Sequence, residues 1–399
     1  MERARITGSI LEEMKDASRV LILSSFSREE VEKPPFGGAR LVAAQAAFFR
    51  GRGLETSVVG MEDFNSPMGL LMKVAGWVRK RRRENAGFLP FSDDEGERNM
   101  WRLNLLFPLM LEAISRIDLL ARRQFVRMVG SGGKVLVVWN YPIGQCILAG
   151  IKAQEGGPEI RTFLYEHNVE GEFFYERLSS GRIFAFMTGI LKRLELTNIS
   201  RVERVICGSG KDRDTLQAAG VESGKLEVWI PRPQPAFRGS TTSEVPPGLR
   251  ERLKGGYVVG FVGSDYGPNA MAVEHIMGMS GELDQEISFL VMGSVCKCFA
   301  DREDIPDNVV LCGFVEDLGV YLRACDAFIS PKTTSDTGIE MKMLDYMEED
   351  KPVFSTVIGA RGFEDYPGLI IAELDQMPMA INREAAARIH PPGGQGNRD

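Results

Sequence analysis

The feature that most constrains the fold is an alternation of short β-branched runs with longer amphipathic stretches, which recurs along most of the 399 residues. RVLILSS at residues 19–25 and KVLVVWNY at residues 134–141 are examples, and each is followed by a longer amphipathic stretch. Short β-branched runs predict strands, and the longer stretches predict helices. Strands that alternate with helices predict parallel βαβ units, so we expect an α/β fold with doubly wound, Rossmann-like sheets.

The alternation is interrupted at residues 231–248, where PRPQPAFRGSTTSEVPPG has the composition of a linker. We therefore expect two Rossmann-like domains, at residues 17–235 and 249–377, each with its own parallel sheet. Residues 64–125 show no strand pattern and are predicted to be a helical insertion in the first domain. Residues 378–399 end in PPGGQGNRD and are predicted to be a disordered tail.

The two halves of the chain differ in charge. Residues 1–240 hold 35 Lys and Arg against 29 Asp and Glu, whereas residues 241–399 hold 13 against 26. This asymmetry indicates an anionic partner for the first half, a phospholipid surface or a phosphorylated acceptor, although solvated surface charge would produce the same asymmetry. The basic residues lie in no zinc-finger, RRM or helix-turn-helix context, so we expect no nucleic-acid partner.

Basic residues are concentrated in one predicted helix, KVAGWVRKRRR at residues 73–83. Its cations are Lys73, Arg79, Lys80, Arg81, Arg82 and Arg83. Trp77 and Val78 accompany them, a combination typical of helices that lie on an anionic membrane; the alternative is a solvated insertion. No apolar run approaches the roughly 20 residues that span a bilayer, and no signal peptide is recognisable. We expect a cytoplasmic protein with peripheral contact at the inner face of the membrane.

Several chemistries are disfavoured. Cys296, Cys298, Cys312 and Cys325 are separated by one, thirteen and twelve residues, which matches no usual zinc pattern, so we expect no metal site. The loop after the first strand lacks G-x-G-x-x-G, which argues against a dehydrogenase. No Ser-His-Asp or Cys-His arrangement has the loop context of a hydrolase.

Ligands of doubly wound sheets bind where strands end, and two such loops of the first domain are informative. Gly37 and Gly38 begin a helix, where paired glycines allow close backbone approach and free N–H groups favour phosphate. Glu166, His167 and Asn168 directly follow the strand RTFLY, so we expect them to face a cleft rather than the core; a loop-capping cluster is the alternative.

Two loops of the second domain are more specific. Gly263, Ser264 and Asn269 precede and begin a helix whose N–H groups suit a diphosphate. The segment KTTSDTGIEMKMLD follows the strand AFISP, and we expect its helix to open at Gly338. Along that helix Lys342 can neutralise phosphate, and the carboxylate of Asp345 can accept two hydrogen bonds from a ribose diol.

Taken in order, these motifs resemble a known family. The glycine pair, EHN, FVGS-x-x-x-PN, NVVLCGFVEDLGVYLRACD, TGIEMKMLDYM and KPVFST-x-x-GARG are similar to retaining nucleotide-sugar glycosyltransferases of the GT-B fold, the glycosyl transferases group 1 or family 4 type. The resemblance covers about residues 19–375 and is most specific at residues 261–362. It implies two Rossmann-like domains that face a central cleft.

The resemblance also implies roles for individual residues. The stretch Gly313 to Val315 holds the base through its backbone, Asp345 binds the ribose, and Gly338 and Lys342 meet the diphosphate. The implied donor-binding residues are Gly37, Gly38, Gly263, Ser264, Asn269, Gly313, Phe314, Val315, Thr337, Gly338, Ile339, Lys342 and Asp345. His167 matches a cleft residue near the anomeric carbon, and with Glu166 it forms the implied catalytic group.

The implied activity is that of a hexosyl-type glycosyltransferase in glycan, polysaccharide or glycolipid synthesis. It moves a sugar from a nucleotide-diphosphate sugar to a hydroxyl of a carbohydrate or lipid-linked acceptor, with retention and with no cofactor or metal. Thr337 stands where typical members have a glutamate, residues 264–269 lack the usual basic pair, and a long terminal helix is not evident. These departures favour an alternative, a weak or inactive nucleotide-sugar-binding or scaffold subunit of an envelope assembly complex. A nucleotide-sugar epimerase is a third reading, which requires more acid and base groups in the cleft than His167.

Overall fold

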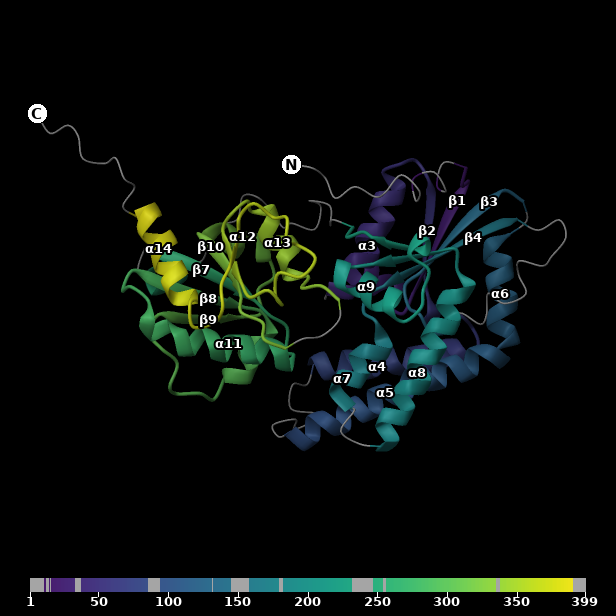
Figure 1. Cartoon of the computed structure of the whole chain (residues 1–399), viewed down its shortest axis with the longest axis horizontal. Helices are drawn as coiled ribbons and strands as arrows, with labels where there is room; N and C mark the ends of the chain where they lie inside the picture. Colours follow the sequence, from purple (N-terminus) through teal and green to yellow (C-terminus); the bar gives the residue numbers. More distant parts are fainter. Residues whose placement is uncertain are drawn as a thin grey trace, which may run out of the picture. The chain divides into compact units, whose positions relative to one another are not determined.

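The chain forms two compact units. The computed structural model describes residues 11, 14, 16–32, 37–84, 94–130, 132–144, 158–178, 182–231, 247–253, 256–334 and 338–389. One unit comprises Met1–Pro233 with Asp336–Ile339, and the other comprises Gln234–Ser335 with Glu340–Asp399. Each unit contains a parallel sheet with helices against it (Figure 1). The predicted α/β fold class, with two doubly wound parallel sheets, is confirmed.

In the described residues of the first unit, six strands pair in parallel in the order β2-β1-β3-β4-β5-β6. Their bounds are β1 (Arg19–Ser24), β2 (Glu55–Gly60), β3 (Lys134–Trp139), β4 (Glu159–Glu166), β5 (Arg204–Cys207) and β6 (Leu226–Val228). After their first residue, β1 and β3 are buried throughout. Parallel strands are covered on both faces, which explains why these two read as continuous apolar runs.

The helices of the first unit lie on both faces of its sheet. They are α2 (Arg28–Glu32), α3 (Gly37–Arg50), α4 (Pro67–Glu84), α5 (Asp94–Ile117), α6 (Leu119–Val129), α7 (Glu170–Leu178), α8 (Arg182–Arg201) and α9 (Gly210–Ala218), with short 3-10 turns at η1 (Met61–Asp63) and η3 (Ser223–Lys225). In the predicted insertion at residues 64–125, the described residues form α4, α5 and the start of α6. α4, α5, α7 and α8 contact one another below the strands in the view of Figure 1.

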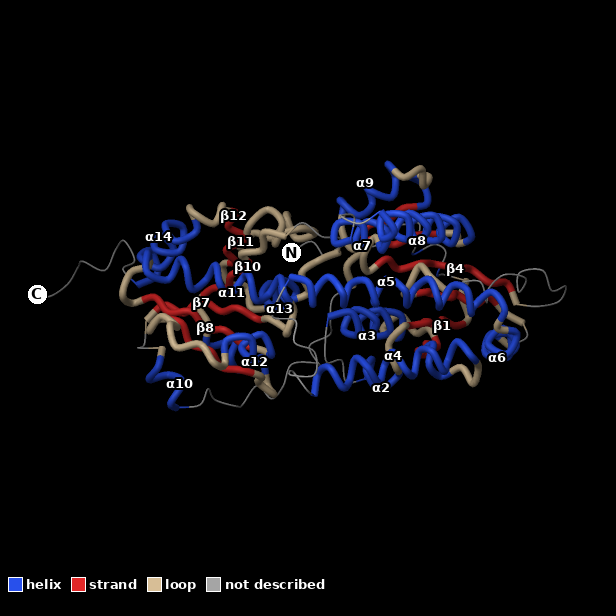
Figure 2. The backbone as a smooth tube through the Cα atoms, turned by 90° about the horizontal axis from the view of Figure 1, so that it is seen from below, coloured by secondary structure: helices blue, strands red, loops and turns tan. Residues whose placement is uncertain are grey.

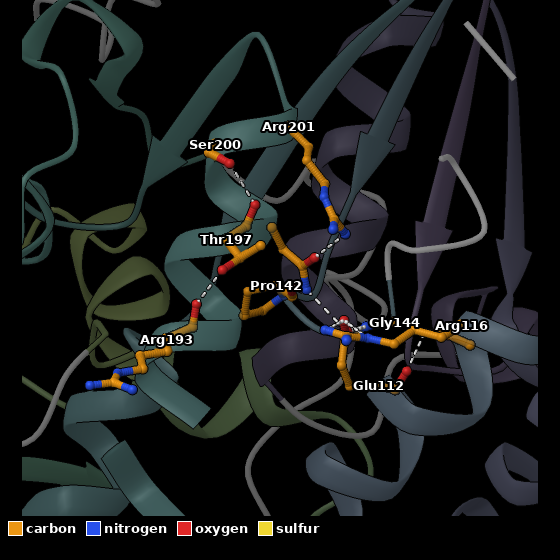
Figure 3. A network of polar contacts seen from close by, with 10 residues as sticks. Glu112, Arg116, Pro142, Gly144, Arg193, Thr197, Ser200 and Arg201 are labelled. Atoms are coloured by element: carbon orange, nitrogen blue, oxygen red, sulfur yellow. Dashed lines mark hydrogen bonds and ion pairs between the residues drawn. The ribbon is translucent and has the colours of Figure 1, made fainter. Parts of the chain in front are cut away.

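Polar contacts attach this helical layer to the sheet. Glu112 on α5 is 2% exposed, and its Oε2 accepts hydrogen bonds from the Gly144 backbone N–H at 2.9 Å and from Asn198 Nδ2 at 3.1 Å. Asn198, on α8, also donates to the Pro142 carbonyl at 2.8 Å. Figure 3 shows that one buried carboxylate thereby joins α5, α8 and the loop after β3.

The described residues of the second unit form another sheet of six parallel strands, ordered β12-β11-β10-β7-β8-β9. The strands are β7 (Tyr257–Val262), β8 (Ile287–Met292), β9 (Val309–Gly313), β10 (Ala327–Ser330), β11 (Val353–Ser355) and β12 (Leu369–Ile371). The helices are α10 (Pro247–Arg252), α11 (Gly267–Met279), α12 (Leu318–Ala324), α13 (Lys342–Glu348) and α14 (Met377–Ile389), with 3-10 segments η5 (Ser280–Glu282) and η6 (Ser294–Phe299). α11 and α14 cover one face of this sheet and α12 covers the other (Figure 2).

Two expectations for the second unit are wrong. The helix expected to open at Gly338 begins four residues later, at Lys342, because Gly338 has a φ of 84° and cannot belong to a right-handed helix. The disordered tail expected at residues 378–399 is helical as far as Ile389. Met377, Ile381 and Ala385 recur at helical spacing and are buried in the core, so the apolar period is present in the sequence. The rest of that tail lies outside the described residues.

No helix in the described ranges is both long enough and apolar enough to cross a membrane.

Candidate functional site

Three glycines join the ends of β7, β8 and β9. The Gly293 N–H donates to the Gly313 carbonyl at 2.7 Å, and a Cβ on Gly293 would lie 2.2 Å from the Gly263 carbonyl oxygen. Gly293 and Gly313 have φ values of 104° and 72°, which favour glycine. These strand ends therefore approach as closely as backbone allows. Gly263 and Gly313 were predicted from the sequence, whereas Gly293 was not, although it directly follows β8.

The loop after β7 places Asn269 beside a lysine. Asn269, in the first turn of α11, donates through Nδ2 to the carbonyl and hydroxyl oxygens of Ser264, at 3.0 and 3.2 Å. Its Oδ1 accepts a hydrogen bond from Lys342 Nζ at 2.9 Å. The Lys342 ammonium also lies 4.4 Å from the centre of the Phe261 ring. Three residues selected from sequence thus lie together in the second unit.

Lys342 belongs to a lysine clasp, which we define as Lys332, Glu340 and Lys342. The Glu340 carboxylate contacts Lys332 Nζ at 2.5 Å and Lys342 Nζ at 3.0 Å, and the three side chains are 11 to 16% exposed. Burial alone would raise the pKa of Glu340, but the two ammonium groups outweigh burial and lower that pKa to about 2. The clasp therefore carries one net positive charge. Glu340 was not predicted from the sequence, although it stands two residues before Lys342.

The position of α13 is set by an aromatic pair. The Tyr346 hydroxyl accepts a hydrogen bond from the Val262 N–H at 2.9 Å, and its ring stacks on Phe328 with centroids 4.4 Å apart. Both rings are completely buried. Asp345 immediately precedes this anchor and is half-buried, and it lies three residues after Lys342, hence on the same side of the helix. A cation and a carboxylate thus share one short, rigidly held helix.

The residues assigned to the base follow β9, the last strand at this edge of the sheet. Gly313 ends β9, and Phe314 is 76% exposed. Val315 is half-buried. An exposed aromatic ring beside a strand end can pack against a planar base, which is compatible with the predicted role.

In the first unit, His167 belongs to a buried amide network. Its Nε2 lies 3.0 Å from Oδ1 of Asn140, which follows β3. That oxygen also accepts from Gln45 Nε2 at 2.8 Å, and Asn140 Nδ2 donates back to Gln45 Oε1 at 2.9 Å. Because the Asn140 oxygen is an acceptor, the hydrogen-bond pattern assigns a proton to His167 Nε2. Burial lowers the pKa of His167 to about 4, so the ring is neutral at neutral pH.

Glu166 does not share the exposure expected of the EHN loop. It is 1% exposed, and neither carboxylate oxygen has a hydrogen-bond partner within the described ranges. Burial and the nearby carboxylates of Glu195, Glu170 and Asp212 raise the pKa of Glu166 well above its usual value. Glu166 ends β4, whose last five residues are all buried, because a parallel sheet is covered on both faces. The expectation that it faces a cleft is corrected.

The glycine pair is partly explained by packing. Gly37 and Gly38 form the first turn of α3, and a Cβ on Gly38 would lie 2.6 Å from the ring of Phe26, which follows β1. That ring in turn packs edge-on against His167, with centroids 6.2 Å apart. Gly38 therefore lets β1, α3 and the histidine loop meet.

Gly338 and Ile339 belong to the first unit by their contacts. The Gly338 N–H donates to Asp212 Oδ1 at 3.2 Å. A Cβ on Gly338 would lie 2.5 Å from the Asn168 side-chain oxygen. Only glycine fits this position, so close packing accounts for Gly338. Thr337 lies outside the described residues.

The structure thus gathers the selected residues into two sets. The set in the first unit is Gly37, Gly38, Glu166, His167, Gly338 and Ile339, and the set in the second unit is Gly263, Ser264, Asn269, Gly313, Phe314, Val315, Lys342 and Asp345. In the part of the chain that the structure describes, no group of three or more His, Cys, Asp or Glu side chains is placed to hold a metal ion.

Comparisons with known proteins show a family match over part of the chain and a fold shared over most of it. Residues 256–385 match the model of the family Glycosyl transferases group 1. No curated protein matches the chain in sequence. The matched segment contains the clasp, all of the selected residues of the second unit, and two that pack with the first.

Solved glycosyltransferase structures share the fold over nearly the whole chain. Anabaena HepE in complex with UDP has a TM-score of 0.54 at 13% identity, covering 93% of this chain and 90% of its own. Sucrose-phosphate synthase from Thermosynechococcus elongatus has a TM-score of 0.55 at 13% identity, covering 92% and 90%. A trehalose-6-phosphate structure from E. coli, bound with UDP-2-fluoro glucose, has a TM-score of 0.52 at 10% identity, covering 92% and 91%. The chain therefore has the GT-B fold of these neighbours.

Proposed function

We propose that this protein is a glycosyltransferase that moves a sugar from a nucleotide-diphosphate sugar to an acceptor hydroxyl. The family match and the GT-B fold support the class of enzyme. The observation that carries the proposal is the lysine clasp, because it holds two cations in a partly buried place beside the first turn of α11. Cations and helix N-terminal N–H groups are the two devices by which proteins hold phosphate.

The donor nucleotide is assigned to the second unit. Lys342 and the first turn of α11 bind the diphosphate, Asp345 accepts hydrogen bonds from the ribose, and Gly313 to Val315 hold the base. Negative charge develops on the diphosphate as the bond to the sugar breaks, so the clasp lysines stabilise the leaving group. The clasp supplies positive charge at this place, and the proposal assigns no metal ion to the reaction.

His167 is assigned to the reacting sugar. Since the ring is neutral and its Nε2–H is engaged by Asn140, His167 acts through a fixed orientation rather than through positive charge. Glu166 is buried and is not assigned contact with substrate. The proposed stereochemistry is retention, which follows from the resemblance to retaining enzymes. A hexose is the proposed sugar, and UDP is the first nucleotide to test because two of the fold neighbours bind UDP or a UDP sugar.

The test begins with ligand binding to the purified chain. The ligands are UDP, GDP, ADP, CMP and their sugar conjugates. We expect at least one of them to raise the melting temperature, since a ligand at 100 times its Kd stabilises the folded chain by about 2.7 kcal/mol. Release of the same diphosphate in the presence of an acceptor then measures transfer. No shift with any nucleotide would contradict the proposal.

A second candidate function has one observation in its favour. Residues 263–269 contain no basic side chain, and Glu340 already neutralises half of the clasp's charge. These features suit a nucleotide-sugar-binding subunit of an envelope assembly complex that binds a donor without consuming it. Nucleotide binding without release of diphosphate for any carbohydrate or lipid-linked acceptor would favour this candidate.

We also propose peripheral contact between α4 and the inner face of an anionic membrane. Leu70, Val74 and Trp77 recur at helical spacing on α4 and are 64%, 53% and 57% exposed. Lys73 is exposed on the same helix, and residues 79–83 continue α4 with the basic sequence RKRRR. Apolar side chains with adjacent cations are what an interfacial helix requires.

Binding to vesicles tests the membrane proposal. The parent chain should bind vesicles that contain phosphatidylserine, and salt should weaken this binding. Val74→Ser with Trp77→Ser should reduce vesicle binding. The control Phe314→Ser, which changes an exposed aromatic residue of the other unit, should leave vesicle binding unchanged. Absence of binding between the parent chain and anionic vesicles would contradict the membrane proposal.

A further inference from the structure

The second unit has a cavity that the donor assignment does not use. Its volume is about 400 Å³, and it is lined by three loops, at residues 332–333, 356–358 and 373–375. These loops follow β10, β11 and β12, three neighbouring strands. The donor residues follow β7 and β9 or lie on α13, apart from Lys332 of the clasp, which follows β10 and also lines the cavity. The cavity is therefore a second place at the carboxyl edge of the sheet, where doubly wound folds bind ligands.

The wall of the cavity is fixed by hydrogen bonds. Thr356 Oγ1 donates to the Lys332 carbonyl and accepts from the Gly359 N–H at 3.1 Å. Ser355 Oγ donates to the Ser330 carbonyl at 3.1 Å. A Cβ on Gly359 would lie 2.4 Å from the Ser330 carbonyl oxygen, so the loop after β11 touches the end of β10. The cavity is thus formed before any ligand arrives, as ligand pockets usually are.

The polar groups of the cavity suit a ligand that donates hydrogen bonds. Glu373 and Asp375 are exposed, and neither carboxylate has a side-chain partner among the described residues. Lys332 contributes its stem, because its ammonium group is held by Glu340 in the clasp. Two carboxylates repel an anion, which excludes phosphate, and they accept the hydrogen bonds of hydroxyl groups.

The rest of the lining is apolar. Val357 is 64% exposed, and Ile358 and Leu374 stand beside it in the lining. Branched aliphatic side chains beside carboxylates suit a pyranose ring, which presents C–H groups on its faces and hydroxyl groups at its rim. A small cation would gain nothing from this apolar surface. The volume falls within the range of about 300 to 1,000 Å³ that is usual for small-molecule sites.

We propose that this cavity is a carbohydrate subsite that holds a neutral sugar unit of the acceptor. Its assignment to the acceptor rests on the proposed glycosyltransferase function, whereas sugar binding itself does not. Glu373 and Asp375 accept hydroxyl hydrogen bonds, and Val357 contacts the ring. The second unit thus contributes to acceptor recognition as well as to donor binding.

Saturation-transfer NMR on the full chain tests the proposal. The probes are the methyl glycosides of glucose, galactose, mannose and N-acetylglucosamine, each with and without excess UDP. At least one glycoside should receive saturation, equally in both conditions. Glu373→Ala with Asp375→Ala should reduce the signal at least fivefold, and so should Val357→Trp, which fills the cavity. Asp301→Ala with Glu303→Ala removes two exposed carboxylates at the same spacing elsewhere in the unit and should change nothing.

The outcomes separate this subsite from the proposed function. No saturation with any glycoside, loss of signal upon UDP addition, or an unchanged signal in both cavity variants would overturn the subsite. If the chain nevertheless binds UDP and releases it on transfer, the proposed function stands. A glycoside signal that depends on the cavity, in a chain that binds no nucleotide, would keep the subsite and remove the proposed function. Melting temperatures of the variants verify that each folds.

Discussion

The two sets of candidate residues differ in how they treat charge. In the first unit, His167, Asn140 and Gln45 form a neutral network, and the carboxyl group of the adjacent Glu166 is buried with no hydrogen-bond partner among the described residues. In the second unit, two lysines and a carboxylate form a charged clasp at a strand edge. A neutral hydrogen-bond network orients the groups that it holds, whereas a partly buried net positive charge attracts anions. The difference predicts that the second unit supplies donor affinity and the first supplies turnover.

The largest expected effect is that of Lys342→Ala. This change removes a cation from the proposed diphosphate site, and we expect UDP to bind about 30- to 100-fold more weakly, corresponding to about 2 to 3 kcal/mol. Titration calorimetry measures the change. Lys297→Ala removes an exposed lysine of the same unit and should leave affinity unchanged. Equal affinities for Lys342→Ala and the parent would break the assignment of charge to the second unit.

His167→Ala sharpens the other half of the comparison. We expect kcat to fall about 100-fold while the Kd for UDP changes less than twofold, because the histidine orients rather than attracts. Asn140→Ala should produce a smaller loss of the same kind, since it frees the ring to turn. A loss of affinity that exceeds the loss of turnover would contradict this separation.

The depressed pKa of His167 adds a pH test. The pKa is about 4 in the folded chain and about 6.5 in the unfolded one, so the unfolded chain takes up the proton first. The contribution of His167 to stability is therefore full above pH 6.5 and is lost as the pH falls from 6.5 towards 4. Chemical unfolding of the parent and of His167→Gln at pH 7 and pH 5 measures it. A difference in unfolding free energy between the two proteins that does not change with pH would contradict the lowered pKa of His167.

Glu340→Gln should have opposite effects on binding and on stability. Removal of the clasp's negative charge should strengthen the binding of inorganic pyrophosphate about three- to tenfold, and low salt should enlarge the gain. The unfolding free energy should fall by about 1 to 2 kcal/mol, because two partly buried lysines lose their partner. Glu303→Gln is the matched exposed control. Weaker pyrophosphate binding in Glu340→Gln would show that the carboxylate is needed to place the lysines.

The smallest effect is expected for Glu166→Gln. Burial, reinforced by nearby carboxylates, raises the pKa of Glu166 well above its usual value, which favours the neutral acid, and at low pH the amide replaces that acid within about 0.5 kcal/mol. A raised carboxyl pKa stabilises the fold at low pH and costs stability as the pH rises through the folded pKa. The unfolding free energy of the variant should therefore rise relative to that of the parent between pH 5.5 and pH 8.5, as measured by chemical unfolding. A difference in unfolding free energy that stays constant over this pH range would show that the Glu166 pKa is not raised.

The sequence predicted the second unit better than the first. Glycines, Asn269 and Lys342 are local signals at strand ends, and their meeting follows from the parallel order of β7, β8 and β9. The clasp itself was not predicted, because Lys332 and Glu340 meet only when the loop after β10 folds back. α14 was missed for a different reason: Met377, Ile381 and Ala385 show the helical period, but the Pro- and Gly-rich end of the tail obscured it.

The amino-acid sequence by itself determined that this protein has two doubly wound sheets, since periodicity and β-branched runs report the burial of each strand and helix. It also determined which strand ends carry polar or glycine residues. Only the tertiary structure decided which of those residues are exposed, charged or paired. Glu166 and His167 are neighbours in sequence, yet the first ends a strand that is covered on both faces, and the second follows that strand and lies against Asn140. Ionisation depends on desolvation and on distant partners, which no local pattern encodes.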